Sequence, residues 1–152
     1  MPAKDIHITY LKMAEVYSQL SHANRKKVGA ILVKDGRIVS TGYNGMPKGM
    51  DNTCEDTLQT REFPWSSLPE PLLKTKHEVI HAEMNAILFA ARNGIPTEGC
   101  TLYLTLSPCV NCGKSIIQSG IKTVFFSDRY RDQSGVKFLE NNGIKVIQQK
   151  IY

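Results

Sequence analysis

The sequence contains no long apolar run. No stretch approaches the roughly 20 uninterrupted apolar residues of a membrane-spanning helix, and the first ten residues, MPAKDIHITY, lack the apolar core of a signal peptide. We therefore expect neither a membrane partner nor export. Internal repeats, low-complexity tracts and composition shifts are also missing, so the length of 152 residues predicts one domain over 1–152.

Cysteine is scarce, with only Cys54, Cys100, Cys109 and Cys112 in the chain. Without an export signal, four cysteines suit metal binding or simple packing better than a disulfide framework. This usage predicts a reducing, cytoplasmic location. The apolar share of 41% and the charged share of 22% are ordinary for a globular protein and exclude a disordered or fibrous class.

The charge is moderately positive, with a formal net charge of +5. Such a charge suits an anionic ligand, for example a nucleotide or a nucleic acid. The basic residues are spread along the chain, however, and the only compact cluster is Arg25, Lys26 and Lys27. A solvated turn between a helix and a strand explains that cluster equally well.

The apolar periodicity predicts strands that alternate with helices after an initial helix and hairpin. Helices are expected over 4–22, within 77–96, and over 109–119 and 135–141; strands over 101–105, 123–127 and 144–149; and a hairpin over 27–45. Right-handed crossovers place helices on both faces of a sheet. We therefore predict an α/β fold, a three-layer α/β/α sandwich around a mixed sheet of about five strands.

A long segment from about 44 to 76 interrupts this alternation. It carries Pro47, Gly49, Pro64, Pro69 and Pro71 and shows little periodicity. Loops of this length are uncommon in compact domains unless they serve a function. We expect a loop insertion that acts as a lid or a binding segment.

The stretch SPCVNC at 107–112 joins an apolar strand pattern to an apolar helix pattern. Ser107 can cap the helix and Pro108 can occupy its first turn, which would place Cys109 and Cys112 on the same face. A helix N-terminus lowers the pKa of a thiol and favours the thiolates that a metal requires. A redox pair has the same requirement, so the Cys-x-x-Cys motif by itself leaves metal, redox and packing roles open.

The sequence HAE at 81–83 decides between these roles. The His81 imidazole and two thiolates make three protein ligands, the number that leaves a zinc ion one open position for water. Glu83 is then a free carboxylate that can accept and return a proton. His-x-Glu with Pro-Cys-x-x-Cys is the signature of zinc-dependent nucleobase deaminases.

The motifs HAEMNAI, TLYLTLSPCVNC and SIIQSGIKTVFFSDRYRD, preceded by VGAILV and GYNGMPKG, closely resemble those of the deoxycytidylate deaminases of the cytidine deaminase superfamily. The resemblance runs from about residue 21 to residue 146. It implies a cytidine deaminase-like fold, one catalytic zinc held by His81, Cys109 and Cys112, and Glu83 as the proton relay. The implied reaction is hydrolysis at C4 of cytosine in dCMP, with dUMP and ammonia as products and dUMP available for thymidylate synthesis.

The resemblance also assigns residues to the mononucleotide substrate. Asn44 lies against the bound nucleotide in the family, and Tyr130 matches a tyrosine near the phosphate. Ala82 offers a backbone N–H to the base, whereas Asn85 supports the neighbouring loop. Our own choices for pairing with the phosphate dianion are Arg25 and Lys27, with surface charge as the alternative.

Many family members are hexamers that dCTP activates and dTTP inhibits, so the resemblance implies a homo-oligomer, with a hexamer favoured. The effector lies near the GYNGMPKG loop, where we expect Gly42 and Gly45 to let the chain turn sharply. Phe89 and Arg92 fall where the catalytic helix reaches a subunit interface. Core packing of Phe89 and a helix C-terminal role for Arg92 are the alternatives.

Some relatives carry a second, structural zinc upstream of the catalytic helix. Here Ala23 and Asn24 occupy the stretch where those relatives place a cysteine. Cys54 and His77 alone would not complete a four-ligand site. We therefore predict one zinc per chain.

Two other functions compete with dCMP deamination. The first is another deaminase of the superfamily, acting on tRNA adenosine, guanine or a nucleoside; nucleic-acid editing requires a broad basic surface and stacking aromatics, and the chain offers one basic cluster. We therefore expect no nucleic-acid partner. The second is a non-catalytic zinc-stabilised nucleotide-binding module, for which the free carboxylate of Glu83 would have no use.

Overall fold

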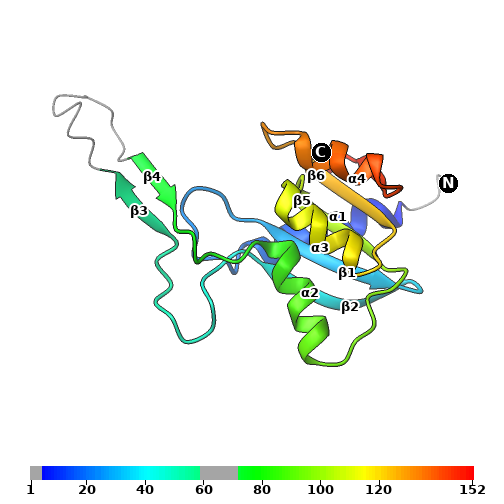
Figure 1. The fold of residues 1–152 in the computed structure, drawn as a ribbon, viewed down its shortest axis with the longest axis horizontal. Coiled ribbons are helices and arrows are strands. Elements are labelled where there is room, and N and C mark those ends of the chain that lie inside the picture. The colour runs from blue at the N-terminus through cyan, green and yellow to red at the C-terminus, as the bar shows by residue number, and fades with distance from the viewer. Residues whose placement is uncertain (1–4, 59–71) are drawn as a thin grey trace.

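The computed structural model describes residues 5–58 and 72–152, which form three layers of helix, sheet and helix (Figure 1). The main sheet has five strands in the order β2-β1-β5-β6-β7. Their bounds are β1 Gly29–Lys34, β2 Arg37–Tyr43, β5 Thr101–Leu106, β6 Thr123–Asp128 and β7 Lys145–Gln148. Strand β1 is antiparallel to β2 and β5, whereas β5, β6 and β7 are parallel. The predicted mixed sheet is confirmed.

Helices cover both faces of this sheet. Those in the described residues are α1 Ile6–Ser18, α2 Ala82–Arg92, α3 Val110–Gln118 and α4 Ser134–Asn141. Helix α1 packs on one face, where Leu11 belongs to a buried cluster with Tyr103 and Phe125. Helices α2, α3 and α4 pack on the other face and bury Ala86 and Ile116. The predicted three-layer α/β/α architecture is therefore confirmed.

Strand β1 contributes side chains to both apolar layers. Successive side chains of a strand point to opposite faces, and accordingly Ile31 and Val33 join the α1 layer while Ala30 and Leu32 join the α2 layer. This explains why the run AILV is continuously apolar rather than alternating. Among the helices of the described segments, none is long and apolar enough to span a bilayer.

The predicted hairpin between β1 and β2 turns at Asp35 and Gly36. Both residues have positive φ angles, 51° and 72°, as the tight primed turn of an Asp-Gly pair requires. The ladder then pairs Gly29 with Tyr43, with one irregularity between Leu32 and Val33. The Asp-Gly signal thus predicts this turn correctly.

The expectation of an unstructured loop over 44–76 is only partly correct. Two short strands, β3 Glu55–Leu58 and β4 Leu72–Thr75, pair antiparallel within it and project away from the main sheet (Figure 1). The Lys76 N–H extends the ladder by donating to the Cys54 carbonyl at 2.8 Å. Runs of four residues are too short to show a strand period. The expected loop residues 59–71 lie outside the described residues.

Two helices begin later in the chain than the periodicity predicts. Helix α1 starts at Ile6 because the Asp5 side chain caps it, accepting from the N–H groups of His7 and Ile8 at 2.9 and 3.3 Å. Helix α2 starts at Ala82 rather than near residue 77. Its delayed start leaves His81 just outside the helix, as the N-cap residue.

Candidate metal centre and active site

His81 is the N-cap residue of α2, with an extended backbone at φ −67° and ψ 154°. The preceding residue is held by Gly45: the Gly45 N–H donates to the Ile80 carbonyl at 3.1 Å, and the Ile80 N–H donates to the Gly45 carbonyl at 2.8 Å. This two-bond bridge keeps the segment before His81 extended. The His81 side chain therefore projects from the helix N-terminus instead of lying within its first turn.

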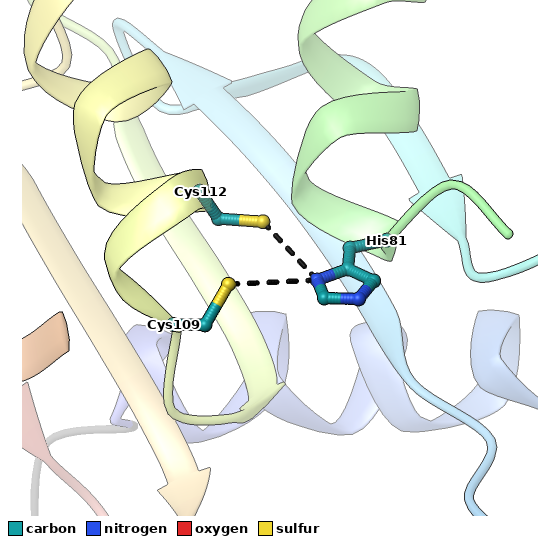
Figure 2. A group of neighbouring side chains, drawn as sticks. All are labelled: His81, Cys109 and Cys112. Carbon is teal, nitrogen blue, oxygen red and sulfur yellow. Dashed lines mark hydrogen bonds between the residues drawn. The ribbon is translucent and has the colours of Figure 1, made fainter. Parts of the chain in front are cut away.

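The two cysteines come from the start of α3 and face His81 (Figure 2). Cys109 is the N-cap residue, whereas Ser107 and Pro108 precede the helix, so the expected Ser107 cap is wrong. The Ser107 hydroxyl instead accepts from the Tyr130 N–H at 2.7 Å. Cys112 lies one turn further along, and both sulfurs thus point across the gap between α3 and α2.

The three side chains form a compact donor set. The His81 Nδ1 atom lies 3.7 Å from Cys109 Sγ and 3.3 Å from Cys112 Sγ, and all three atoms fall within 4.8 Å of one another. In a tetrahedral site with Zn–S of about 2.3 Å and Zn–N of about 2.0–2.1 Å, nitrogen and sulfur lie about 3.6 Å apart. The observed separations lie on either side of this value, so the residues fit zinc.

The electrostatics of the triad favour a thiolate. Hydrogen bonds with Cys112 and His81 lower the pKa of Cys109 to about 3. The same contact with Cys109 raises the pKa of the Cys112 thiol, and the hydrogen bond to Cys109 raises the pKa of His81. The contacts within the triad thus favour the thiolate form of Cys109. All four cysteines of the chain lie in described segments and are free, so the sulfurs of Cys109 and Cys112 form no disulfide.

Glu83 lies in the first turn of α2, two residues after His81. Its side chain is 4% exposed and lines the same cavity as His81 and Cys109. Burial raises the pKa of the Glu83 carboxyl above its ordinary value. The centre therefore combines a nitrogen-sulfur ligand set with a buried carboxyl group that can hold a proton.

Two side-chain hydrogen bonds join helix α2 to strand β2. The Ser40 hydroxyl donates to the Ala86 carbonyl at 2.6 Å, and the Asn85 side-chain amide donates to the Tyr43 carbonyl at 2.7 Å. Gly42 lies in β2 without a positive φ, so the expectation that it makes a sharp turn is wrong. Gly45 also has no positive φ; it forms the bridge to Ile80.

A cavity of about 310 Å³ adjoins the donor set. Four of the expected substrate residues line it: Arg25, Asn44, Ala82 and Tyr130. Lys27 instead lines a neighbouring hollow of about 360 Å³, and the adjacent Lys26 borders both. The structure thus brings Lys26, rather than Lys27, to the cavity beside Arg25.

Asn44 organises the wall of this cavity. Its side-chain oxygen accepts from the Val28 N–H at 2.9 Å, and its side-chain nitrogen donates to the Lys26 carbonyl at 2.8 Å. Arg25 is held separately, because its guanidinium donates to the Thr75 hydroxyl of β4 at 3.2 Å. The Asn44 amide therefore fixes the basic turn in place as well as facing the cavity.

Glu55 is a cavity residue that the sequence did not reveal. It is the first residue of β3, its side chain is only 6% exposed, and it borders the same space as Glu83. A single glutamate in a segment rich in proline and glycine carries no motif. The one local feature is that Glu55 and Asp56 form an acidic pair after Cys54. Such a pair does not by itself indicate a binding site.

The residues expected at an interface or a second metal site lie apart from this cavity. Phe89 and Arg92 are on the outer part of α2, and Phe89 is 51% exposed, so it is not a core residue. Within 5–58 and 72–152, His81, Cys109 and Cys112 are the only three-residue cluster with metal-ligand spacing. Cys54 is buried and His77 exposed, and neither belongs to such a cluster.

Comparison with known families agrees with this geometry. Residues 4–128 match the family described as the cytidine and deoxycytidylate deaminase zinc-binding region. The matched range includes His81, Glu83, Cys109 and Cys112. The chain therefore belongs to this family of zinc-dependent deaminases.

Within this family, the chain is similar to individual deoxycytidylate deaminases. The deoxycytidylate deaminase of Enterobacteria phage T4 is 39% identical, over 91% of this chain and 86% of that protein. The deoxycytidylate deaminase of Mus musculus is 42% identical, over 81% of this chain and 65% of that protein. The solved dCMP deaminase of cyanophage S-TIM5, in complex with dCMP and dUMP, has a TM-score of 0.84 and 36% identity, covering 98% of this chain and 100% of that one. The resemblance to deoxycytidylate deaminases is thus confirmed.

Proposed function

We propose that this chain catalyses the zinc-dependent hydrolytic deamination of dCMP to dUMP and ammonia. The observation that carries the proposal is the buried Glu83 carboxyl, which lines one cavity with His81 and Cys109 of the His81, Cys109 and Cys112 donor set. The names of the T4 and mouse relatives, and the dCMP and dUMP held by the cyanophage structure, support cytosine deoxynucleotide as the substrate.

His81, Cys109 and Cys112 would hold the zinc ion. Zinc held by three protein ligands would lower the pKa of a water molecule at its open position. Glu83 accepts a proton from the attacking water and delivers it to the cytosine ring nitrogen. It then takes a second proton from the hydroxyl group added at C4 and delivers it to the departing amino nitrogen, which leaves as ammonia. Its buried setting suits this task, because the raised pKa of Glu83 lets the carboxyl hold a proton between the two transfers.

The remaining cavity residues would recognise the nucleotide. Arg25 and Lys26 provide positive charge for the phosphate, and Lys27 in the neighbouring hollow adds to the same field. The backbone of Ala82 at the start of α2 faces the base, and Asn44 and Tyr130 border the sugar and phosphate. A cavity of about 310 Å³ suits one mononucleotide rather than a folded nucleic acid.

Assembly and regulation follow from the same proposal. An exposed aromatic residue such as Phe89 on the catalytic helix suits a contact between subunits, and a homo-hexamer with Arg92 at the same contact is our expectation. We place dCTP and dTTP effectors near Gly42 and Gly45. We place the enzyme in the cytoplasm, where reducing conditions keep the Cys109 and Cys112 thiols available as ligands and where dUMP would supply thymidylate synthesis.

The test is ammonia release by the zinc-loaded protein from dCMP, CMP, deoxycytidine and an RNA hairpin, assayed side by side. We expect turnover of dCMP to exceed that of deoxycytidine by at least about 10-fold in kcat/KM, because a phosphate held by charge-assisted hydrogen bonds contributes about that much. Equal turnover of deoxycytidine would contradict phosphate recognition. Preferred turnover of the hairpin would replace the proposal with nucleic-acid editing.

A further inference from the structure

Glu55 is the one residue in the described segments with a buried side-chain oxygen or nitrogen atom that lacks a hydrogen-bond partner. Its Oε1 atom accepts from the backbone N–H groups of Asn24 and Arg25 at 2.8 and 3.1 Å. No described residue donates to its Oε2 atom. An unpaired buried acceptor destabilises the folded state, so this oxygen calls for a functional explanation.

The carboxyl group is held firmly at the cavity wall. Glu55 pairs with Thr75 across the β3–β4 ladder, and Thr75 in turn accepts from the Arg25 guanidinium at 3.2 Å. Arg25, Glu55 and Thr75 all border the cavity that contains Glu83. The Oε1 atom is held by two backbone donors, and the Glu55 backbone is held by the β3–β4 ladder. The Oε2 atom is therefore an acceptor in a fixed position.

The chemistry of a nucleotide limits what this acceptor can bind. A phosphate offers only acceptor oxygens and negative charge, which a carboxyl oxygen would repel. The base oxygen and the ring nitrogen of cytosine are also acceptors. Its amino group is the one donor of the base, and that group must lie at the metal centre beside Glu83 to react. In a deoxynucleotide, the 3′-hydroxyl of the sugar is the remaining donor.

We propose that Glu55 accepts a hydrogen bond from the sugar 3′-hydroxyl of the bound nucleotide through its Oε2 atom, an inference that rests on the proposed function of this cavity. Glu55 is then a specificity residue. It selects nucleotides with a free 3′-hydroxyl and disfavours 3′-deoxy analogues, because they would leave its buried oxygen unpaired. The β3–β4 hairpin thereby contributes a substrate contact to a site built mainly on the central sheet.

Binding of the product isolates this contact without turnover. The zinc-loaded protein is titrated by calorimetry with dUMP and with 2′,3′-dideoxyuridine monophosphate. The wild type should bind dUMP at least about 10-fold more tightly, the value of a hydrogen bond to a charged acceptor. In E55Q an amide N–H replaces the acceptor, and the two affinities should lie within about 3-fold of each other. Gln can retain the oxygen that the Asn24 and Arg25 N–H groups need.

The matched control is D56N, which removes a carboxylate from the next residue of β3. Asp56 points to solvent, with a side chain 64% exposed and an ion pair to Lys76 at 3.9 Å. Its variant should keep the wild-type preference for the 3′-hydroxyl. If E55Q weakens both nucleotides equally, Glu55 is only a brace for the backbone of residues 24–25, and the proposal is overturned.

Measurements on the wild-type protein alone also test the contact between Glu55 and the 3′-hydroxyl. Equal affinity for the two nucleotides would overturn the inference, as would a crystal structure with dUMP in which the 3′-oxygen is beyond hydrogen-bond distance of Glu55. These outcomes are separate from catalysis. A protein that binds dUMP with the expected preference and releases no ammonia from dCMP would refute the proposed reaction and leave the Glu55 contact standing.

Discussion

Gly42 of β2 and Ala82 of α2 are packed so closely that no side chain fits between them. A methyl group added at Gly42 would lie 2.3 Å from the Ala82 carbonyl oxygen and 2.6 Å from the Ala86 nitrogen. Ala82 separates His81 from the buried Glu83 in the sequence. The backbone of β2 is therefore the surface against which the active-site end of α2 is positioned.

Gly42→Ala should destabilise the protein and weaken zinc binding together. Both atoms that the new methyl group meets belong to the α2 backbone, so the helix must move, and overpacking of this kind costs about 1–3 kcal/mol. Urea denaturation and zinc titration measure the two effects. Gly45→Ala is the control, because among the described residues no atom beyond its two chain neighbours lies within 4 Å of its added carbon, and its φ is not positive. Equal stability of both variants would contradict the packing argument.

Glu83→Gln should keep zinc and lose turnover. The amide has the size of the carboxyl group but cannot carry a proton between water and the base, and loss of general acid–base catalysis costs about 10²–10⁴ in rate. Metal analysis and ammonia release test the two parts independently. Glu140→Gln, at an exposed position on α4, should behave as the wild type. If Glu83→Gln turned over dCMP at the normal rate, the proton-relay role would be wrong.

Removal of zinc by a chelator should lower the melting temperature as well as abolish activity. The ligands come from the starts of two helices, so an ion between them links α2 to α3 in the folded chain only. Each tenfold excess of free zinc over its dissociation constant adds about 1.4 kcal/mol of stability. Added zinc should restore both properties, with one ion per chain. Two ions per chain, or an unchanged melting temperature, would contradict the single structural link.

Arg25→Ala should raise the KM for dCMP by about 10-fold and leave the KM for deoxycytidine almost unchanged, because the lost partner is the phosphate. The effect should shrink as salt rises, since Arg25 is exposed. Lys27→Ala, in the neighbouring hollow, should change KM less. Steady-state kinetics with both substrates at two salt concentrations measure this. A larger effect of Lys27→Ala would reverse the assignment.

The cluster of His81, Cys109 and Cys112 was predictable because its residues come in two contiguous motifs. His81 and Glu83 are two positions apart, Cys109 and Cys112 are three apart, and their chemistry permits few arrangements. The layers were predictable because the apolar patterns of α2 and β5 extend over enough residues to identify a helix and a strand. Helix starts were less accurate because they depend on distant contacts, such as the bridge from Gly45 to the residue before His81.

The cavity wall could not be predicted from sequence in the same way. Which of two adjacent lysines, Lys26 or Lys27, faces the cavity depends on an irregular turn with no period, fixed by the Asn44 amide from a different strand end. Glu55 meets its partners 30 and 31 residues away in the chain. The β3–β4 hairpin that carries it has strands of four residues, too short for a periodic signal.

On the opposite face of the sheet, Tyr103 should make the protein lose stability at high pH. Burial, with smaller effects from Tyr10 and Asp5, raises the pKa of Tyr103 from its ordinary value of 10.0 to about 12. The folded state thus retains the phenol proton that the unfolded chain releases. The stabilisation is fully present below pH 10 and is lost as the pH rises through about 12.

Two pKa units set an upper bound of about 2–3 kcal/mol on this contribution to the unfolding free energy, and solvent screening reduces it. Tyr103→Phe should start less stable at neutral pH by about 1 kcal/mol, because the hydrogen bond between the Tyr103 hydroxyl and His7 Nδ1 at 2.8 Å is lost. Its stability should then fall less steeply between pH 10 and 12 than that of the wild type. Urea denaturation at pH 8, 10 and 11 measures the difference, and the variant retains the other alkaline groups, including the buried Cys54 and Cys100. Parallel curves for the two proteins would show that the Tyr103 phenol ionises as readily in the folded chain as in the unfolded one.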